Sequence, residues 1–509
     1  MSTDSLTPEP IAVQHASAMP DLTERLAEVG DLALAGIPLP RTLEELGLQV
    51  RRDLDLIQYP MKSWVLPKIA PDGSKALDVL IIGAGQAGLA TAFGLIQQRV
   101  MNILAIDENE EGREGPWGVY ARMETLRTQK DVGGIESGVP SLSLRAWYEV
   151  QYGLRSWEQL YKIPTDIWRR YLDWYRDVIG IPVRNGCRMI RFGPSPTAGL
   201  LEVEIEDAHG VRGKLWAKML VLATGIEGNG ARHVPDYVAS IPKSIWAHTH
   251  EFIDFEALAG KHVAVLGGGA SAFDNAILAA EAGAQRVDLY HRTPLLRPAN
   301  AMAWGEFNGY LAHFPDLPIE ERWRFTRQMR KFRGGPPLRT IARAERAANL
   351  TIHAGVTWHG LGMQDDRPLV HAADGDIAAD FLIFGTGYKV GMELRSEFAE
   401  HVDKIALWRD VFSPPESERD DGLLRACYLG PNFETLEKQA GCAPWLASVF
   451  NFSHGANLSM GAMSIGLSGI KFGIPRLIHG VTKKLFVDDS AAYFEGMKIW
   501  QQSENVYEP

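Results

Sequence analysis

Two glycine-rich turns carry the clearest chemistry of this chain. The first contains Gly83, Gly85 and Gly88 and lies between an apolar run, DVLII, and a helical pattern, QAGLATAFGLI. Glycines at this spacing allow a tight turn and a close approach of the backbone to a pyrophosphate, which the start of the helix then faces. Asp107 ends the next apolar run, 24 residues after Gly83, where an acid accepts hydrogen bonds from ribose hydroxyls. The pattern predicts a dinucleotide site that includes Asp107 and the adjacent Glu108.

The second turn contains Gly267, Gly269 and Ala272 in the same setting between a strand pattern and a helix pattern. The residue that corresponds to the acid of the first turn is Arg292, 25 residues after Gly267. An arginine pairs with a ribose 2′-phosphate, which an acid would repel. The second site is therefore predicted to prefer NADP over NAD and to use Ser271 and Arg292, although Arg292 as an ordinary surface residue is the alternative. FAD with NADPH is the simplest pair of cofactors for the two sites.

The cysteine content limits what accepts electrons from such a pair. The chain has only Cys187, Cys427 and Cys442, and no two of them form a Cys-x-x-Cys pair. A redox-active disulfide, an iron–sulfur relay and a thiolate zinc site are therefore excluded. His248 and His250 offer two metal ligands without a third, so no metal is predicted. Dioxygen or a small acceptor remains.

The elements that must position these turns repeat along the chain. A strand, a glycine turn and a helix occur near residue 77 and again near residue 262, and each unit is later followed by a similar turn, LATG at 222–225 and GTGY at 385–388. The pattern predicts an α/β protein with two Rossmann-like domains, the NADPH domain inserted in the FAD domain. The expected parts are an N-terminal helical arm (1–76), the first part of the FAD domain (77–240), the NADPH domain (241–378), and the second part of the FAD domain with C-terminal helices (379–509). The strand at 380–384 is expected to return to the first sheet.

The N-terminal arm carries short helical patterns. Thr42 and Glu45 form a capping box before a stripe of Leu46, Val50 and Leu54. We expect this segment to pack on the main body, and a role in gating substrate is the alternative.

The composition limits the partners and the location that can be expected for this chain. The chain has 509 residues, 46% of them hydrophobic, with a net charge of −11 and a pI of about 5.7. The acidic balance argues against nucleic acid or an anionic membrane as the main partner. No apolar run approaches the ~18 residues of a membrane span, and MSTDSLTPEP lacks an apolar signal core, so the cytoplasm is the expected location. A small-molecule substrate and O2 are the expected partners, with a homo-oligomer possible.

These motifs resemble those of the class B flavin-dependent monooxygenases over roughly residues 77–480. The resemblance adds Gly115-Pro116-Trp117, and it includes the GTGY turn, in which Gly385 replaces the family's usual alanine. It implies that NADPH reduces FAD and that the reduced flavin and O2 give a C4a-hydroperoxyflavin, which oxygenates a small organic substrate. Further cofactor contacts implied by the resemblance are Trp117, Gln129, Gly225, Gly387 and Tyr388.

Within the class, the Baeyer–Villiger fingerprint places a tryptophan four residues after a histidine. That position holds Phe252 after His248 and Asp254 after His250, so the fingerprint fails.

Three segments are instead similar to those of the ornithine and lysine N-hydroxylases. The similarity implies that Lys130 in TLRTQKDV holds a substrate carboxylate, that Asn300 in RPAN contacts substrate, and that His454 and Ser459 lie near the flavin. Lys130 as a solvated or FAD-contacting residue is the alternative reading. We predict N-hydroxylation of an amine. The alternatives are Baeyer–Villiger oxidation of a ketone and a flavin NADPH oxidase or redox sensor without an organic substrate.

Overall fold

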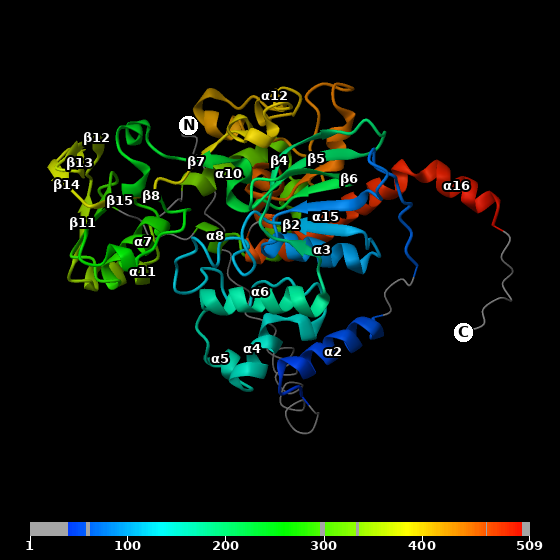
Figure 1. Ribbon diagram of the computed structural model, residues 1–509, viewed down its shortest axis with the longest axis horizontal. Helices are drawn as coiled ribbons and strands as arrows, with labels where there is room; N and C mark the ends of the chain where they lie inside the picture. The colour runs from blue at the N-terminus through cyan, green and yellow to red at the C-terminus, as the bar shows by residue number, and fades with distance from the viewer. Residues whose placement is uncertain (1–38, 58–61, 296–300, 332–334, 465, 501–509) are drawn as a thin grey trace, which may run out of the picture.

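The computed structural model describes residues 39–57, 62–295, 301–331, 335–464 and 466–500. Two lobes, each built on a parallel sheet, lie side by side, with β1 to β6 in one and β8 to β15 in the other (Figure 1). This is the predicted α/β architecture. None of the helices in the described ranges is long and apolar enough to cross a membrane.

The first lobe contains a seven-stranded sheet. Its parallel part has the order β3-β2-β1-β6, with β17 parallel to β6, and β5 and β4 extend it as an antiparallel ribbon. The strands are β1 (Leu77–Ile82), β2 (Ile103–Ile106), β3 (Val183–Arg184), β4 (Cys187–Pro194), β5 (Leu201–Asp207), β6 (Arg212–Leu222) and β17 (Val449–Asn451). Helix α3 (Gln86–Gln97) packs between α6 (Thr165–Ile179) and α15 (Leu467–Asp488). The apolar run of β1 is buried on both faces because helices cover the sheet.

The second lobe contains a five-stranded parallel sheet of order β11-β10-β9-β15-β8. The strands are β8 (Trp246–His248), β9 (His262–Leu266), β10 (Arg286–His291), β11 (Leu350–Ala354) and β15 (Phe381–Phe384). Helices α7 (Ala270–Glu281) and α11 (Leu338–Arg346) pack on it, and an antiparallel meander precedes β15: β12 (Trp358–Gln364), β13 (Arg367–Ala372) and β14 (Gly375–Ala378).

The expected return of the chain to the first sheet at residue 380 is wrong. β15 lies beyond the predicted end of the NADPH domain at residue 378, yet it pairs with β9 and β8 of the second sheet. The reason is that both lobes follow one plan, in which a meander leads into a last parallel strand and then a glycine turn. The similar turns after β6 and β15 therefore close two different lobes. The chain rejoins the first sheet only at β17.

Two chain segments connect the lobes and pair with each other. These are β7 (Gly230–Arg232) and β16 (Tyr388–Val390), which form a two-stranded antiparallel ribbon. A second connection is helical: α8 (Ala301–Trp304), α9 (Asn308–His313) and α10 (Ile319–Lys331) leave the second lobe, and α9 and α10 pack on α15 and on α14 (Asn457–Met460) of the first.

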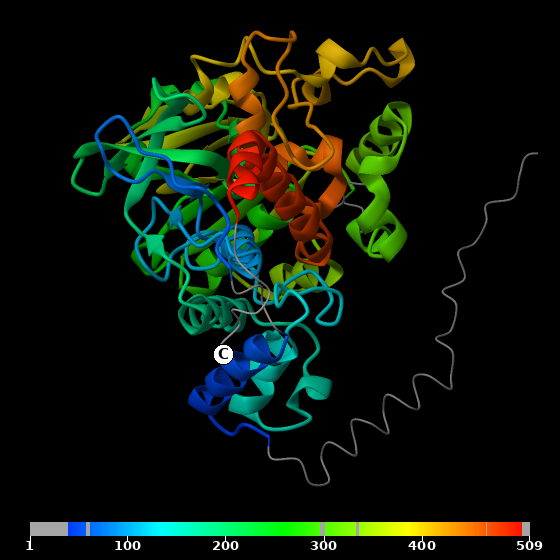
Figure 2. The ribbon, with the colours of Figure 1, turned by 90° about the vertical axis from the view of Figure 1, so that its right-hand side faces the viewer.

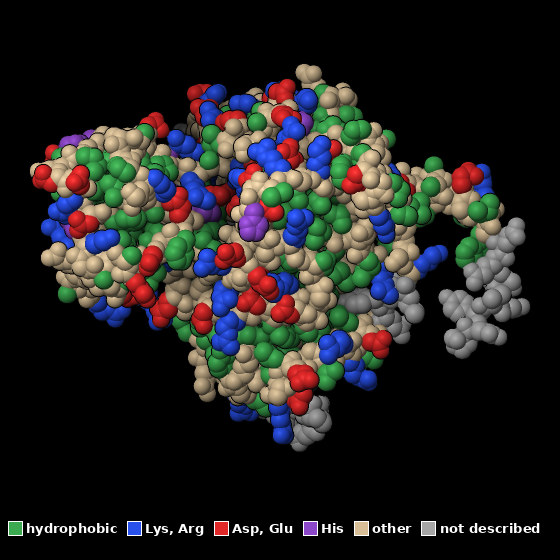
Figure 3. Space-filling model, viewed as in Figure 1, with side chains coloured by type: hydrophobic (Ala, Val, Ile, Leu, Met, Phe, Trp, Pro, Cys, Tyr) green, Lys and Arg blue, Asp and Glu red, His purple; other side chains and the backbone are tan. Residues whose placement is uncertain are grey.

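The arm packs on the main body as expected. Helix α2 (Leu43–Leu56) lies against α4 (Leu144–Tyr152), and Leu46 and Val50 are fully buried there (Figures 1 and 2). Thr42 caps the helix by accepting from the Glu45 amide at 3.1 Å. The remaining short helices are α5 (Ser156–Gln159), α12 (Trp408–Val411), α13 (Asp421–Leu424) and α16 (Ser490–Lys498). Acidic and basic side chains alternate over the face shown in Figure 3, without a large patch of one sign.

Candidate functional site

The first glycine turn is built so that only glycine fits it. Gly83 has a φ of +100°, and a Cβ atom there would lie 2.5 Å from the carbonyl oxygen of Ala223. A Cβ atom on Gly88 would lie 1.9 Å from the carbonyl oxygen of Gly83, and one on Gly85 3.2 Å from the Cα atom of Gly115. The start of α3 is therefore bare backbone, as the approach of a pyrophosphate requires.

Asp107 lies directly beneath this turn. Its carboxylate accepts from the Ala84 amide at 2.8 Å and from the Asn109 amide and side chain at 2.9 and 3.0 Å. Burial raises the pKa of Asp107, and these hydrogen bonds oppose that rise. Burial, with the nearby charges of Asp107 and Glu227, also raises the pKa of Glu108. Asp107 thus lies against the turn, and Glu108 follows it directly in the chain.

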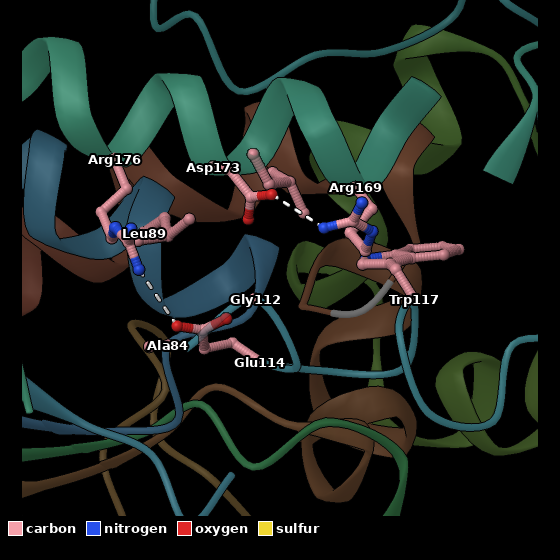
Figure 4. A pocket seen from close by; sticks show the side chains of 9 residues that line it. Ala84, Leu89, Gly112, Glu114, Trp117, Arg169, Asp173 and Arg176 are labelled. Atoms are coloured by element: carbon pink, nitrogen blue, oxygen red, sulfur yellow. Dashed lines mark hydrogen bonds and ion pairs between the residues drawn. The ribbon is translucent and has the colours of Figure 1, made fainter. Parts of the chain in front are cut away.

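A small pocket opens beside the turn (Figure 4). Helix α6 supplies Arg169, Asp173 and Arg176, and the ion pairs Arg169–Asp173 (2.9 Å) and Arg176–Glu114 (3.2 Å) line it. Trp117 lies at its edge and packs edge-to-face on Trp168 at 6.4 Å between ring centroids.

The Trp117 indole nitrogen is buried, and it has no hydrogen-bond partner among the residues that the structure describes. Buried donors normally have an acceptor. Together with the bare glycine backbone, this orphaned donor fits a bound dinucleotide at the first turn.

The structure describes most of the other residues that were predicted to lie near the flavin. Gly225, with a φ of +61°, begins the turn Gly225–Asn229, which packs against the turn His454–Ala456. Gly225 and the half-buried His454 therefore belong to adjoining segments. Gln129 is exposed. Asn300 lies outside the described residues.

Lys130 and Ser459 are engaged by the protein itself. The Lys130 ammonium donates to the carbonyl oxygens of Trp157 and Glu158 and lies 5.4 Å from the centroid of the Trp157 ring. Ser459 is fully buried. Its hydroxyl accepts from the Trp408 indole (3.1 Å) and the Leu429 amide (3.2 Å), a pattern that holds α14 in place.

The second turn leaves its predicted nucleotide contacts accessible. Gly267 has a φ of +151°, and Gly269 caps α7 with open space where a Cβ atom would lie. Ser271, in the first turn of α7, and Arg292, just after β10, are both exposed. A phosphate at the start of α7 would therefore meet backbone amides and a hydroxyl, and the exposed Arg292 guanidinium follows the neighbouring strand β10.

The two departures from the usual motifs compensate for each other. Ala272 stands at the third position of the second turn, and Gly385 stands where the family's turn has alanine. A Cβ atom on Gly385 would lie 2.5 Å from the Cβ atom of Ala272. In the first lobe the small residue is Gly88 and the alanine is Ala223, so the pair is exchanged between the lobes.

A polar cluster at the connecting ribbon escaped the sequence analysis as a site. The His250 ring hydrogen-bonds the Tyr388 hydroxyl at 2.6 Å and stacks on Tyr120 at 3.7 Å between centroids. Burial lowers the pKa of His250 to about 3 and that of His248 to about 4, so both rings are neutral at physiological pH. The spacing His248-x-His250 and Tyr388 in GTGY were the available signals, but only the fold brings them together.

The ribbon itself is fixed by nearby charges. Arg232 pairs with Glu227 at 2.5 Å and with Glu251 at 3.3 Å, and Gly387 (φ +79°) accepts from the His248 ring at 3.2 Å. Within the described ranges, no three His, Cys, Asp or Glu side chains are arranged to hold a metal.

Comparisons with known proteins agree with this geometry. The family model described as pyridine nucleotide-disulphide oxidoreductase matches residues 77–310. An FAD-dependent urate hydroxylase from Xanthomonas campestris pv. campestris is 38% identical over 469 residues, which cover 91% of this chain and 98% of that protein. Ornithine hydroxylase from Pseudomonas aeruginosa is 15% identical with a TM-score of 0.62, covering 81% of this chain and 100% of that one.

L-lysine 6-monooxygenase from Pseudomonas syringae is 16% identical with a TM-score of 0.60, covering 80% of this chain and 99% of that one.

The three cysteines are free thiols, and Cys187 and Cys427 are buried, so no disulfide lies in the path of the electrons. The chain belongs to the same family as the FAD-dependent urate hydroxylase, a family of flavin-dependent oxidoreductases, and it has the fold of the ornithine and lysine hydroxylases.

Proposed function

We propose that this enzyme is an FAD-containing, NADPH-dependent monooxygenase that hydroxylates a small, planar nitrogen heterocycle of the urate type. The observation that carries the proposal is the 38% identity to an FAD-dependent urate hydroxylase, because it extends over 98% of that protein and not over the nucleotide domains alone. In the balanced reaction, one oxygen atom of O2 enters the substrate and the other leaves as water, with two electrons from NADPH.

The first lobe holds the FAD. The bare backbone of Gly83, Gly85 and Gly88 receives the pyrophosphate, and Asp107 accepts from the ribose hydroxyls. The unpartnered Trp117 indole donates to the cofactor. Bound FAD supplies the transfer of two electrons from NADPH and the activation of O2, and the protein must keep water away from the reacting atoms.

The second lobe holds the NADPH. The start of α7 receives its pyrophosphate, with Ser271 beside it, and Arg292 pairs with the 2′-phosphate. Both side chains are exposed before the nucleotide binds, which suits a cosubstrate that must enter and leave in each cycle.

The second candidate is N-hydroxylation of an amine that carries a carboxylate. It is favoured by Lys130, whose ammonium contacts neutral carbonyl oxygens and makes no ion pair with an acid of the described residues. Its positive charge is therefore not neutralised and remains available for a substrate carboxylate.

The test uses purified, FAD-loaded enzyme with NADPH and O2. Urate, ornithine, lysine and a cyclic ketone are added separately, and NADPH consumption, peroxide and oxygenated product are measured. We expect urate to raise NADPH consumption with little peroxide and to give a hydroxylated product. A hydroxylamine from ornithine or lysine would favour the second candidate, and an ester or lactone from the ketone would overturn both. Peroxide as the sole product with every compound would identify an NADPH oxidase.

A further inference from the structure

One short ion pair with a buried carboxylate joins the two lobes outside the connecting ribbon. The Arg127 guanidinium lies 2.7 Å from the Asp274 carboxylate. Arg127 belongs to residues 125–132 of the first lobe, and Asp274 lies in the second turn of α7 in the second lobe. Only 9% of the Asp274 side chain is exposed, against 38% of Arg127, so the carboxylate is buried and the guanidinium is partly open to solvent.

The other charged contacts between these surfaces are weaker. Arg339 and Arg343 of α11 approach Glu124 at 3.8 and 3.9 Å, and the Glu124 side chain is 58% exposed. Exposed pairs at such distances contribute little. The short Arg127–Asp274 pair, whose carboxylate is buried, is therefore the charged contact that can hold α7 against residues 125–132.

Each residue of the pair belongs to a segment that is predicted to bind a cofactor. Asp274 belongs to α7, and Arg127 belongs to residues 125–132. Asp274 lies one helical turn after Ser271, and the Asn275 side chain donates to the Ser271 carbonyl oxygen at 2.7 Å, which ties that turn together. On the other side, the Arg127 carbonyl oxygen accepts from the Lys162 ammonium at 2.6 Å. A shift at the pair would thus move the NADPH-binding turn relative to the flavin lobe.

An attachment at α7 adds to the ribbon and to the helical connection through α9 and α10, and it limits rotation of α7 about them. β7 and β16 join the lobes through one narrow two-stranded contact, and rotation about such a contact changes the distance between the two nucleotides. Arg122 secures the lobes near the ribbon by donating to the carbonyl oxygens of Thr249 and Glu251 at 2.7 and 2.5 Å. The Arg127–Asp274 pair secures them at α7.

We propose that Arg127 and Asp274 are positioning residues, which hold the NADPH-binding helix α7 in register with the flavin lobe during hydride transfer and oxygenation. The inference rests on the proposed function, since it assigns NADPH to α7. Neither residue touches the reacting atoms. Together they fix the orientation in which the nicotinamide reaches the flavin and then keeps water from it. A small misplacement of reacting groups costs rate steeply, about a hundredfold for roughly 1 Å.

The test compares Asp274→Asn and Arg127→Gln with a matched control on the same helix. Glu281 of α7 makes an equally short pair with Arg343, at 2.6 Å, but both partners lie in the second lobe. Glu281→Gln therefore removes a charge and an ion pair from α7 and leaves the Arg127–Asp274 pair intact, while Arg343 keeps only its weak 3.9 Å approach to Glu124 of the first lobe. Flavin reduction by NADPH is followed without oxygen in a stopped-flow instrument, and the peroxide formed per NADPH is measured in air.

We expect Asp274→Asn and Arg127→Gln each to slow flavin reduction at saturating NADPH by roughly tenfold or more and to raise the peroxide fraction. The double variant should lose little more than either single variant, because both changes remove one contact. Glu281→Gln should match the wild type. Equal effects of Asp274→Asn and Glu281→Gln, or normal reduction in Asp274→Asn, would overturn the inference.

Failure of the proposed function has a different signature. If the wild type forms only peroxide with every substrate, the monooxygenase assignment fails, but flavin reduction without oxygen still needs no substrate and still decides the role of the pair. If NADPH does not reduce the wild-type flavin at all, the nucleotide assignment and the inference fail together.

Discussion

The exchanged pair Ala272 and Gly385 allows a direct test of the packing beneath the second glycine turn. Gly385 does not have a left-handed φ, so alanine is excluded there by space and not by backbone conformation. In Gly385→Ala the new Cβ atom would lie 2.5 Å from the Cβ atom of Ala272, 2.9 Å from its Cα atom and 3.2 Å from its nitrogen. Ordinary carbon–carbon contact is about 3.5–4.0 Å. Ala272 is fully buried on α7, so strand and helix must separate.

The expected cost of Gly385→Ala is about 1–3 kcal/mol, the usual range for overpacking a buried site. Ala272→Gly alone should cost about 1 kcal/mol, because glycine is a poorer helix former. In the double variant the 2.5 Å clash with the Ala272 side chain is gone, and the 2.9 and 3.2 Å approaches to the Cα atom and the nitrogen must relax. The first lobe carries this arrangement with Gly88 and Ala223. We therefore expect the two changes to couple favourably by about 1–2 kcal/mol.

Native-state hydrogen exchange of the α7 peptide is the suitable assay, since it reports local opening of that helix. Exchange in Gly385→Ala should be roughly tenfold or more faster than in the wild type, and Ala272→Gly added to it should slow exchange again. Peptides from α3 in the first lobe serve as an internal control and should not change. Additive effects of the two substitutions would refute the packing argument.

Three further predictions follow from the two nucleotide sites and the ribbon. Arg292→Ala should raise the KM for NADPH by roughly tenfold or more and leave that for NADH nearly unchanged; equal losses would contradict the phosphate assignment. Asp107→Asn should weaken FAD binding by about tenfold or more, measured by flavin fluorescence on dilution, since one charged acceptor is lost; unchanged retention would remove Asp107 from the site. Burial lowers the pKa of His250 to about 3. Between about pH 6.5 and 3, the unfolded chain therefore binds a proton on His250 that the folded chain does not bind. The free energy of unfolding falls as the pH is lowered through that range. His250→Gln should remove about 1.4 kcal/mol per pH unit of that slope, and an unaltered slope in urea unfolding would exclude His250 as its source.

The nucleotide turns were predictable because their chemistry is local. Gly83 to Gly88 and Asp107 belong to one strand–turn–helix–strand unit, and the contact between Asp107 and Ala84 spans 23 residues. The same locality predicted Ser271 and Arg292. Trp168, Tyr171 and Tyr175 were likewise expected to be core residues from their helical spacing, and all three are fully buried on α6.

The contacts between lobes were not predictable, because they depend on how distant segments meet. Tyr388 and His250 lie 138 residues apart, and Arg127 and Asp274 lie 147 apart. In both pairs, the local sequence around one residue does not indicate which distant residue it contacts. The error at β15 has a related origin: the similarity of LATG and GTGY was recognised, but a repeat of the whole lobe produces the same similarity as a return to one sheet.

The repeated plan of the lobes also makes their differences informative. In the first lobe the acid after β2 stabilises the glycine turn directly, because the Asp107 carboxylate accepts a hydrogen bond from the Ala84 amide. In the second lobe the corresponding position after β10 carries Arg292, whose side chain is exposed and which we propose pairs with the 2′-phosphate of NADPH. A turn ordered by its own protein needs little rearrangement to hold a nucleotide, so binding loses less free energy to ordering. A turn completed by the ligand suits a cosubstrate that leaves in every cycle. Under the proposed function, the exchange of one acid for one arginine therefore fits a resident flavin in the first lobe and a departing nicotinamide nucleotide in the second.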